Sequence, residues 1–446
     1  MYKKILIANR GEISVRVIRA CREMGIKTVT VHSTADANAL HVQLSDESMC
    51  IGSPPSIESY LKIPNIISVA EVTGAEAIHP GYGFLSEDGN FVEKCNASGI
   101  DFIGPSSDVI KQMGDKITAR KVAEAAGCPI TPGSEDAIPD SKVLVGMAKS
   151  IGFPVMIKAS AGGGGRGMRI VNSMSGLVNA YDTAKAEALS CFKNDEVFLE
   201  KFIEEPRHIE IQLLGDKFGN VIHLGERDCS IQRRNQKIIE EAPAKDLSDE
   251  LREKMGDAAV KVAKAVGYYS AGTIEFLVDK HENFYFMEMN TRLQVEHPVT
   301  EMVTGIDIVK ESIKISAGEK LKITQDNVTI IGHAIECRIN AEDSETFIPS
   351  PGKISDYHAP GGLGIRVESA AYHGWDIPPY YDSMIAKLIS YGNDRNMAIR
   401  KMLGALDEYI IEGIKTNIKL HRRVLRSLRY QKDSIDTSFL KYFTKM

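Results

Sequence analysis

Paired cysteines, long apolar runs and an excess of basic residues are all missing from this 446-residue sequence. Its seven cysteines are scattered without a Cys-x-x-Cys pair, which argues against a disulfide framework and against a zinc site. No apolar run approaches the length of a membrane span, and the start, MYKKILIANRGE, lacks a signal-peptide pattern. The formal net charge of -6 argues against a nucleic-acid binder, because phosphate recognition needs a basic surface. We therefore expect a cytoplasmic protein that binds neither membrane nor nucleic acid.

What is present indicates two or three ordinary globular domains, with 43% hydrophobic and 26% charged residues. Residues 4–8 and 27–32 read as strands around a helix over 12–24, a βαβ unit that opens a doubly wound α/β domain. The first turn has one glycine where a dinucleotide fingerprint has three, so we do not expect a dehydrogenase. Three prolines in residues 127–139 predict a linker to a second domain, and the last third alternates like a mixed or antiparallel sheet.

The most informative stretch is NFYFMEMNTRLQVEHPVTE, residues 283–301. Residues 284–289 read as a strand, and side chains two apart on a strand share a face. If the chain stays extended beyond this strand, one side of it carries Glu288, Asn290, Arg292, Gln294 and Glu296. A solvated strand face is the alternative interpretation, but such faces usually mix Lys, Thr and Ser. The unbroken order of acid, amide and guanidinium groups favours a site for chemistry.

A metal site is predicted where this stretch meets the strand before it. Residues 272–279 read as a strand that a short turn joins to the next, so a hairpin should bring Glu275 beside Glu288. Carboxylate and amide oxygens, here with Asn290, are the ligands that Mg²⁺ shares with substrate phosphates. Arg292 offers a planar fork for a small oxyanion, and Glu296 is a carboxylate that can hold or remove a proton.

A glycine-rich loop supplies a candidate phosphate site. Residues 153–158 and 168–171 are predicted strands, and AGGGGRG at 161–167 joins them. Glycines let backbone N–H groups approach a phosphate closely. No Lys-Ser/Thr pair closes the loop, so it is not a Walker A loop. A hairpin that folds over a triphosphate fits better than a flexible linker, because apolar strands flank the loop and Lys158 is adjacent.

Other candidate residues have plainer alternatives. Cations gather in RDCSIQRRNQK, residues 227–237, which in an acidic protein favours anion binding, although a solvated charge run has the same composition. Taken alone, Lys116 fits a surface lysine and His208 a structural histidine. Tyr82, in the loop HPGYGFLSE, fits a packed aromatic, and Arg338 fits one half of a surface ion pair.

Together these motifs resemble those of the biotin carboxylase family. Its ATP-grasp domain is matched by the glycine hairpin, by EKFI at 200–203 and by EMNTRLQVEHPVTE at 288–301. The resemblance extends over nearly the whole chain through IANRGE (7–12), HPGYGFLSE (79–87), FIPSPG (347–352) and YDSMIAKL (381–388). It implies a Rossmann-like domain over 1–115, an ATP-grasp domain over 116–330 with a lid over about 132–203, and a C-terminal mixed or antiparallel α+β domain over 331–446.

The resemblance also implies a role for each matching residue. ATP would meet Lys116, Lys158, Gly164, Gly165, Glu200, Lys201, Phe202, Ile203 and His208, with Gln232 and Asn235 near its ribose and phosphates. Mg²⁺ or Mn²⁺ would bind Glu275, Glu288 and Asn290. Bicarbonate would meet Lys237, Arg292, Gln294, Val295 and Glu296, and biotin would meet Tyr82 and Arg338. The chain departs from the family at Asn235, where the family often has a histidine, because asparagine hydrogen-bonds but carries no charge.

The implied reaction is the ATP- and bicarbonate-dependent carboxylation of biotin through carboxyphosphate. Bicarbonate must lose a proton to attack the γ-phosphate, so Glu296 is the predicted base, with Arg292 and Lys237 holding the oxyanion. Phosphate would then take the ureido proton of biotin, and Arg338 would stabilise the resulting enolate. The glycine hairpin could close as a lid that keeps water from carboxyphosphate.

The expected partners follow from the same resemblance. No Ala-Met-Lys-Met biotin-attachment sequence occurs, so we expect biotin on a separate biotin carboxyl carrier protein, along with carboxyltransferase subunits and a homodimer. The resemblance favours the acetyl-CoA carboxylase of fatty-acid synthesis, with propionyl-CoA and pyruvate systems as alternatives. Another ATP-grasp carboxylate-amine ligase is less favoured, because RLQVEHPVTE points to bicarbonate. A regulatory subunit without turnover would have lost a metal carboxylate or the base. This chain keeps Glu275, Glu288 and Glu296.

Overall fold

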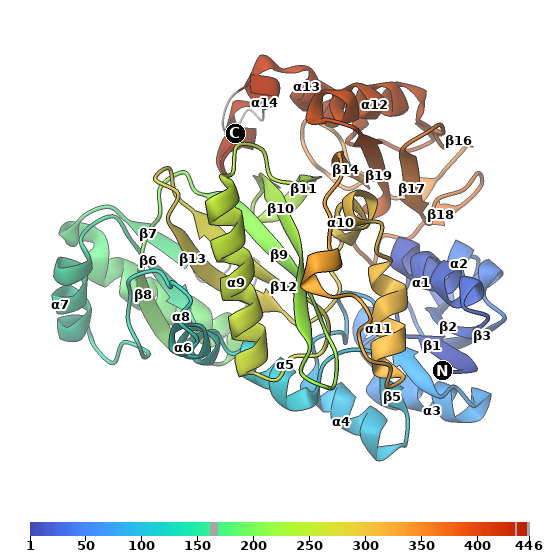
Figure 1. Cartoon of the computed structure of the whole chain (residues 1–446), viewed down its shortest axis with the longest axis horizontal. Coiled ribbons are helices and arrows are strands. Elements are labelled where there is room, and N and C mark those ends of the chain that lie inside the picture. The colour runs from blue at the N-terminus through green and yellow to red at the C-terminus, as the bar shows by residue number, and fades with distance from the viewer. Residues whose placement is uncertain (161–167, 433–434, 444–446) are drawn as a thin grey trace.

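The computed structural model describes residues 1–160, 168–432 and 435–443 of the chain (Figure 1). The predicted phosphate loop at 161–167, with Gly164 and Gly165, lies outside the described residues. A parallel sheet forms the N-terminal part and antiparallel sheets form the rest, so the predicted α/β fold class is confirmed. Every helix among the described residues is too short or too polar to cross a bilayer.

The N-terminal part is a five-stranded parallel sheet with the order β3-β2-β1-β4-β5. The strand order reverses between β1 and β4, and ligands of such sheets bind beyond the carboxyl ends of the strands at that point. The loops that leave β1 and β4 there carry Asn9 and Tyr82, and the Asn9 amide donates to the carbonyls of Pro80 and Tyr82 at 2.6 and 2.8 Å. The elements are β1 (Lys4–Ile7), α1 (Gly11–Glu23), β2 (Lys27–Ser33), α2 (Leu40–Leu44), β3 (Glu47–Gly52), α3 (Ile63–Thr73), β4 (Ala77–His79), α4 (Gly89–Ala97), β5 (Asp101–Phe102) and α5 (Ser107–Gly114).

A small separate sheet with the order β7-β6-β8 projects at the left of Figure 1. Its core, which includes Val155, Leu177 and Leu199, is distinct from the core of the central sheet. Helix α6 (Lys116–Ala125) precedes this unit, which comprises α7 (Ser141–Ile151), β6 (Val155–Ala159), β7 (Met168–Val171), α8 (Leu177–Phe192) and β8 (Val197–Lys201). The strands on both sides of residues 161–167 are antiparallel neighbours, as the predicted hairpin requires.

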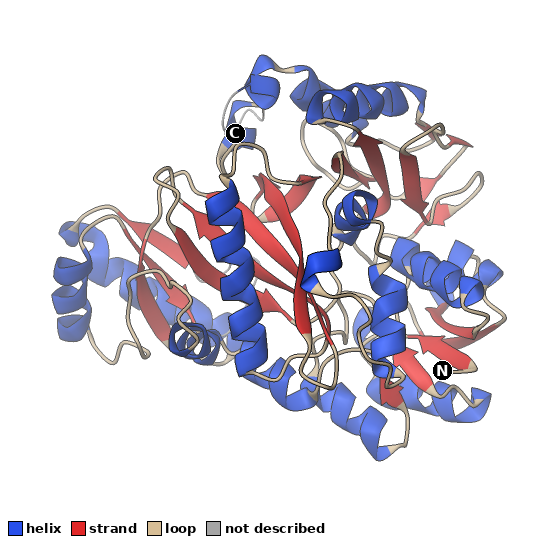
Figure 2. Cartoon of the chain, in the orientation of Figure 1, coloured by secondary structure: helices blue, strands red, loops and turns tan. Residues whose placement is uncertain are grey.

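The centre of the molecule is an eight-stranded antiparallel sheet, β13-β12-β9-β10-β11-β14-β19-β17. Helix α9 lies along one face of it (Figure 2) and buries Leu251, Met255 and Val262 against it, with the Ser248 side chain capping its first turn. The central elements are β9 (Arg207–Gly215), β10 (Val221–Arg233), β11 (Gln236–Ala242), α9 (Asp249–Ala265), β12 (Ser270–Val278), β13 (Phe284–Asn290), α10 (His297–Thr304) and α11 (Ile308–Ser316).

The last third completes that sheet and adds its own helical layer. Strands β14, β19 and β17 pair antiparallel, as the alternating pattern predicts, and β14 pairs with β11. The elements are β14 (His333–Asn340), β15 (Gly352–Lys353), β16 (Asp356–His358), β17 (Ile365–Ser369), β18 (Asp376–Ile377), β19 (Met384–Gly392), α12 (Arg395–Glu408), β20 (Ile410–Glu412), α13 (Ile418–Arg426) and α14 (Leu428–Lys432). One sheet therefore crosses the expected boundary at 330/331, and the domain boundaries stay predictions.

Two hairpins of the central sheet set up the site. In the hairpin of β12 and β13, Glu275 pairs with Glu288, as predicted. In the hairpin of β10 and β11, Arg234 and Asn235 form a two-residue turn and both have positive φ, which asparagine tolerates. That turn brings Gln232 opposite Lys237.

The prediction that the chain stays extended after β13 is wrong. The strand ends at Asn290, the chain bends at Arg292 and turns at Val295 and Glu296, and α10 begins at His297 with Pro298 in its first turn. Proline is favoured there because its fixed φ suits a helix start and it needs no hydrogen-bond partner. The polar side chains of the stretch converge through these turns instead of lining up along one strand.

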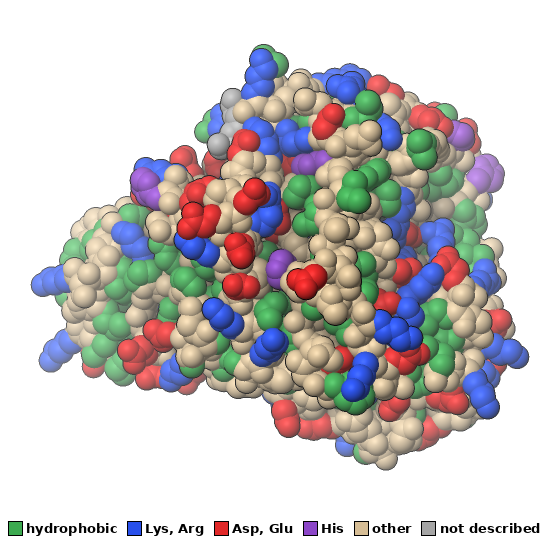
Figure 3. All heavy atoms as spheres, viewed as in Figure 1, with side chains coloured by type: hydrophobic (Ala, Val, Ile, Leu, Met, Phe, Trp, Pro, Cys, Tyr) green, Lys and Arg blue, Asp and Glu red, His purple; other side chains and the backbone are tan. Residues whose placement is uncertain are grey.

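Charge is mixed over the outer surface. Acidic and basic side chains are interspersed on the face shown in Figure 3, over the central helix as well as at the two ends of the molecule. This distribution agrees with a modest net charge of -6 over 446 residues. The concentrated charge of this protein lies inside, in the cleft described next.

Candidate active site

A single cleft of about 1650 Å³ brings together residues from every part of the fold. Tyr82 lines it from the N-terminal sheet, Lys158 from the small sheet, Glu288 from the central sheet and Arg338 from the C-terminal strands. The other described site residues also line it: Lys116, Glu200, Lys201, Phe202, Ile203, His208, Gln232, Asn235, Lys237, Glu275, Asn290, Arg292, Gln294 and Val295. Glu296 is the exception, since it is fully buried behind the cleft wall.

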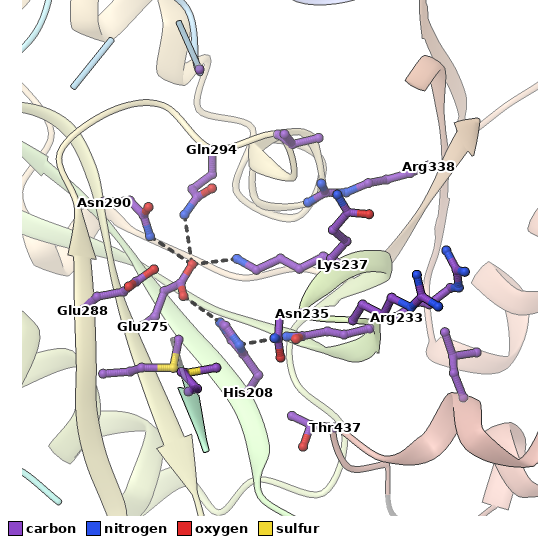
Figure 4. A pocket seen from close by; sticks show the side chains of 18 of the residues that line it. His208, Arg233, Asn235, Lys237, Glu275, Glu288, Asn290, Gln294, Arg338 and Thr437 are labelled. Carbon is purple, nitrogen blue, oxygen red and sulfur yellow. Dashed lines mark hydrogen bonds and ion pairs between the residues drawn. The ribbon is translucent and has the colours of Figure 1, made fainter. Parts of the chain in front are cut away.

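The Lys237 ammonium lies among three carboxylates, and its contact with one of them, Glu275, is drawn in Figure 4. Its Nζ is 2.5 Å from Glu210, 2.8 Å from Glu275 and 2.6 Å from Glu296. Burial alone would lower the pKa of Lys237, but these three carboxylates outweigh burial and hold it well above its usual value. Lys237 is therefore cationic and fixed at the point where the predicted metal and bicarbonate residues meet.

Glu275 is the most heavily bonded carboxylate of the site. Asn290 and Gln294 donate to its Oε1 at 2.9 and 3.1 Å, beside Lys237, and His208 Nε2 lies 3.1 Å from its Oε2 (Figure 4). Burial opposes its charge, but Lys237 and His208 outweigh burial and lower its pKa. Glu275 is consequently a permanent anion on the floor of the cleft.

Glu288 faces Glu275 from the neighbouring strand and has a different environment. Burial and the negative charge of Glu275 raise the pKa of Glu288, although Lys116 opposes this shift. Two carboxylates side by side, one buried and one partly buried, repel each other unless a cation or a proton lies between them. The pair therefore fits a divalent cation, which prefers carboxylate oxygens. Asn290 can add its amide oxygen through a second lone pair, the first being taken by Arg292.

Other groups of potential ligands surround this pair. Ligand atoms of His208, Glu210 and Glu275 lie within 4.8 Å of one another, as do those of Glu210, Cys229 and Glu296. The Lys237 ammonium already bonds Glu210, Glu275 and Glu296 and supplies a positive charge to both groups. The pair of Glu275 and Glu288 opens on the cleft and is the better position for a metal that shares triphosphate oxygens.

Arg292 is held along the cleft wall by three side-chain oxygen acceptors. Its Nε donates to Glu87 at 2.7 Å, its Nη2 to Asn290 at 2.9 Å and its Nη1 to Gln294 at 2.9 Å. The side chain is 19% exposed, so the guanidinium is fixed but reachable by a small oxyanion. Sequence reasoning missed Glu87 as a partner, although it ends the loop motif HPGYGFLSE.

Arg338 joins the site from β14 and is not one half of an exposed ion pair. Its Nε donates to Glu240 at 2.5 Å and its Nη2 to Glu296 at 3.0 Å, while its own side chain is 17% exposed. Burial raises the pKa of Glu240 to about 7 although Arg338 opposes the shift. For Glu296, burial is outweighed by Lys237 and Arg338, which hold its pKa well below the usual range.

The small sheet contributes a second charged group at the far end of the cleft. Lys158 and Arg120 donate to the two oxygens of Glu200 at 2.5 and 2.7 Å, so Glu200 is neutralised from both sides. The Lys201 side chain turns away and donates to the backbone carbonyls of Gly152 and Phe153. Lys116 begins α6, and burial lowers its pKa. A group with more than one cation suits the triphosphate of a nucleotide.

His208 is oriented by Gln232. The Gln232 amide nitrogen can only donate, so Nδ1 of His208 accepts at 2.8 Å and the ring proton is on Nε2, toward Glu275. Asn235 projects into the cleft from the hairpin turn beside them (Figure 4). Thr437, which sequence reasoning did not single out, comes to this end of the cleft from the C-terminal segment, where its N–H donates to Pro206 at 3.0 Å.

Two further findings lie outside the sequence predictions. Arg227, counted above with an anion-binding cluster, is fully buried and bonds Glu210, Gln212, Thr273 and Thr300 instead of lining the cleft. Glu210 and Glu240, the carboxylates that hold Lys237 and Arg338, come from strands that carry no recognisable motif. The one feature of the sequence that marks them is a glutamate within a run of apolar residues that is typical of a buried strand.

Comparison with known proteins gives the family. The model for the biotin carboxylase N-terminal domain matches residues 1–110, and the model for the biotin carboxylase C-terminal domain matches 336–442. Between them, the carbamoyl-phosphate synthase L chain ATP binding domain matches residues 115–324. Biotin carboxylase from a Nostoc species is 57% identical over 445 residues, which cover 100% of both chains. The chain belongs to the biotin carboxylase family. It is thereby an ATP-grasp ligase, as the motifs predicted.

Other relatives and solved structures support the same assignment. Biotin carboxylase 1 from Bacillus subtilis is 56% identical over 448 residues, covering 100% of both chains. One of the pyruvate carboxylase subunits of Methanothermobacter thermautotrophicus is 53% identical over 446 residues, covering 100% of this chain and 91% of the relative. A biotin carboxylase complex from Campylobacter jejuni, named with β-γ-ATP, superposes with a TM-score of 0.97 at 52% identity and covers 99% of each chain. The biotin carboxylase domain dimer of Hydrogenobacter thermophilus 2-oxoglutarate carboxylase, with MgADP, ADP and bicarbonate, gives 0.95 at 51% identity, covering 99% of this chain and 98% of that one.

Proposed function

We propose that this chain carboxylates biotin with bicarbonate and ATP, through carboxyphosphate. The observation that carries the proposal is the convergence of Lys237, Arg338 and Glu296 at 2.6 and 3.0 Å beside the paired carboxylates of Glu275 and Glu288. A carboxylate beside Lys237 is suited to taking a proton from an anion that the same ammonium attracts. The relatives named biotin carboxylase, and the neighbour named with bicarbonate and MgADP, support the choice of substrates.

The first step joins bicarbonate to the γ-phosphate. Lys237 and Arg292 hold bicarbonate, and Glu296 takes its proton. The freed oxygen then bonds to the γ-phosphorus while the bond to the bridging oxygen breaks and ADP leaves. Glu275 and Glu288 would hold Mg²⁺ or Mn²⁺, whose charge offsets the negative charge that builds on the triphosphate.

Glu296 must become more basic for this step. Although burial opposes its charge, the neighbouring Lys237 and Arg338 hold its pKa well below the usual range of a glutamate. A bicarbonate ion that accepts a hydrogen bond from Lys237 shares the charge of this ammonium with Glu296. The carboxylate then loses part of its stabilisation and its pKa rises. The arrangement makes the base effective only when its substrate is bound.

The second step transfers the carboxyl group. Carboxyphosphate breaks its carbon–oxygen bond to give CO₂ and phosphate, and phosphate removes the proton from the ureido nitrogen of biotin. The nitrogen then bonds to CO₂, while Arg338, which is always cationic, stabilises the negative charge on the ureido oxygen. Tyr82 closes the biotin side of the cleft. The small sheet with the loop at 161–167 would act as the lid that excludes water.

The proposal includes the residues and partners that the resemblance implies. Lys116, Lys158, the segment 200–203 and His208 would bind ATP, with Gln232 and Asn235 beside its ribose and phosphates. Biotin would arrive on a carrier protein and leave for a carboxyltransferase, and the enzyme would work as a homodimer in the cytoplasm. A neighbouring structure named as a dimer supports the oligomeric state.

The reaction is tested by phosphate release from ATP in four mixtures, with and without bicarbonate and with and without free biotin. We expect release to need bicarbonate and to rise with biotin, with carboxybiotin formed in step. Phosphate release that depends on neither bicarbonate nor biotin would overturn the proposal. An amine-dependent release would favour the carboxylate-amine ligase instead.

The acceptor of the carboxyl group is a separate question, because relatives named for biotin carboxylase and for pyruvate carboxylase are almost equally similar. We propose the acetyl-CoA system, in line with the full-length relatives named biotin carboxylase. Purified carboxyltransferases for acetyl-CoA, propionyl-CoA and pyruvate, each with its own carrier, would be compared for product formation. Turnover only with the pyruvate set would replace this part of the proposal.

A further inference from the structure

A lysine that the reaction above does not use is completely buried beside the cleft. Lys387, in strand β19, has 0% exposure. Its Nζ donates to the backbone carbonyl of Val295 at 2.7 Å and lies 3.3 Å from Glu12 Oε1. It is the cross-strand neighbour of Arg338 on β14. An ammonium costs much to bury, and a methionine would fill a similar volume without that cost, so its partners should explain it.

The first partner belongs to the turn that would hold bicarbonate. Gln294 and Val295 lie in the turn between β13 and α10, and the carbonyl of Val295 is bonded by Lys387. The carbonyl of Gln294 is 2.7 Å from Nδ1 of the buried His297. Both peptide groups of the turn are thus fixed from behind, which sets the direction of the groups that face the cleft.

The second partner leads to the biotin side. Glu12, at the start of α1, accepts a hydrogen bond from the Tyr82 hydroxyl through the same Oε1 that faces Lys387. Lys387 Nζ also lies 5.8 Å from the centre of the Tyr82 ring. The other oxygen of Glu12 has no hydrogen-bond partner among the described residues, so Lys387 is the principal compensation for this buried carboxylate.

We propose that Lys387 is a positioning residue that fixes the Val295 turn and, through Glu12, the Tyr82 hydroxyl, so that the bicarbonate and biotin subsites keep one relative geometry. The inference rests on the function proposed above. Lys387 connects three segments far apart in sequence, α1, the turn before α10 and β19, at the point where they surround the transferred carboxyl group. Displacement of a reacting group by about 1 Å can lower turnover roughly 100-fold, so fixing this turn matters for rate.

The test is Lys387→Met, which keeps the bulk and removes the charge and the donors. We expect the KM for bicarbonate to rise about tenfold and kcat/KM for free biotin to fall by a similar factor, while the Kd for ATP stays within about twofold of wild type, as for loss of an outer-shell contact. A lysine that only supports the fold would instead lower stability and change all three constants together.

Two further variants keep the test decisive if Lys387→Met folds poorly. Glu336 lies beside Lys387 on β14, fully buried, and neither of its carboxylate oxygens has a hydrogen-bond partner among the described residues. Lys387→Met/Glu336→Gln removes this uncompensated carboxylate while the Val295 carbonyl still lacks its donor, so the rise in the KM for bicarbonate should persist. Glu12→Gln keeps an acceptor for Tyr82 but loses the attraction to Lys387, and it should weaken biotin use without changing the KM for bicarbonate.

The outcomes separate this inference from the proposed function. If wild type releases no phosphate in response to bicarbonate and biotin, the proposed function fails. If wild type is active and a Lys387 variant that binds ATP normally shows an unchanged KM for bicarbonate, only the role of Lys387 is overturned. A fall in biotin use by Glu12→Gln equal to its effect on bicarbonate would also contradict the division between the two subsites.

Discussion

Replacing Arg338 by glutamine tests the division of labour between the two steps. The variant keeps a hydrogen-bonding side chain but removes the charge that would stabilise the biotin enolate. Loss of one donor aimed at a developing oxyanion typically costs about 100-fold to 1000-fold in kcat, or roughly 3 to 4 kcal/mol. Arg338 also bonds Oε2 of Glu296 at 3.0 Å, but Lys237 still bonds the other oxygen, Oε1, at 2.6 Å in the variant. We therefore expect biotin carboxylation to fall roughly 100-fold and bicarbonate-dependent ATP cleavage to fall less than about tenfold.

The fold should survive this change because of the state of Glu240. Its pKa is already about 7, so without Arg338 it can take a proton near neutral pH instead of remaining a bare buried anion. A matched control is Arg395→Gln, because Arg395 holds Glu241, the next residue of the same strand, at 2.6 Å and does not line the cleft. The control should lower the melting temperature and leave the ratio of the two activities unchanged.

The assay measures both activities on the same preparation, carboxybiotin from labelled bicarbonate and phosphate from ATP. Equal losses of the two activities in Arg338→Gln would refute the assigned role, because they would put Arg338 in the first step as much as in the second. A selective loss of biotin carboxylation in Arg395→Gln would show that loss of any buried ion pair to β11 has this effect.

Three further predictions follow from the site. Glu296→Ala should lower turnover roughly 100-fold or more while the nucleotide still binds, measured by equilibrium titration; retained turnover would exclude Glu296 as the base. Glu288→Gln should raise the Mg²⁺ concentration for half-maximal activity about tenfold, and a chelator should stop wild-type turnover; an unchanged metal requirement would exclude Glu288 as a ligand. Glu241→Gln should lower the melting temperature at neutral pH. Although burial opposes its charge, Arg395 and His333 lower the pKa of Glu241 from 4.5 to about 2. The contribution of the Glu241 charge to stability is therefore complete above pH 4.5 and is lost as the pH falls toward 2. The difference in melting temperature between variant and wild type should therefore become smaller in acid. A difference that does not change with pH would contradict this role of the Glu241 charge.

Local signals carried the sequence predictions furthest. The pairing of Glu275 with Glu288 was predictable because two short strands with a tight turn between them have few other ways to pair. The parallel N-terminal sheet was predictable from its first βαβ unit, since such crossovers impose neighbouring parallel strands. The α9 helix has an equally local basis, because the Ser248 side chain accepts from the N–H of Leu251 at its start.

Long-range contacts could not be predicted in the same way. Glu240 meets Arg338, and Lys387 meets both Glu12 and Val295, across separations of 92 to 375 residues that no local pattern encodes. The turn after Asn290 was missed because a polar alternation reads alike in a strand and in a chain that folds back. The tight enclosure of Glu296 by cations was also beyond sequence reasoning, since it depends on strands from two parts of the chain.

The central claim, that a bicarbonate oxygen attacks the γ-phosphate beside Lys237 and Glu296, is tested most directly with ¹⁸O-labelled bicarbonate. The enzyme would be given ATP, Mg²⁺, biotin and the labelled bicarbonate, and the released phosphate would be analysed by mass spectrometry. Attack by bicarbonate forms the new phosphorus–oxygen bond with a labelled oxygen, which stays with phosphate when CO₂ leaves. We therefore predict labelled phosphate in step with carboxybiotin. Unlabelled phosphate formed at the rate of carboxybiotin would contradict the account.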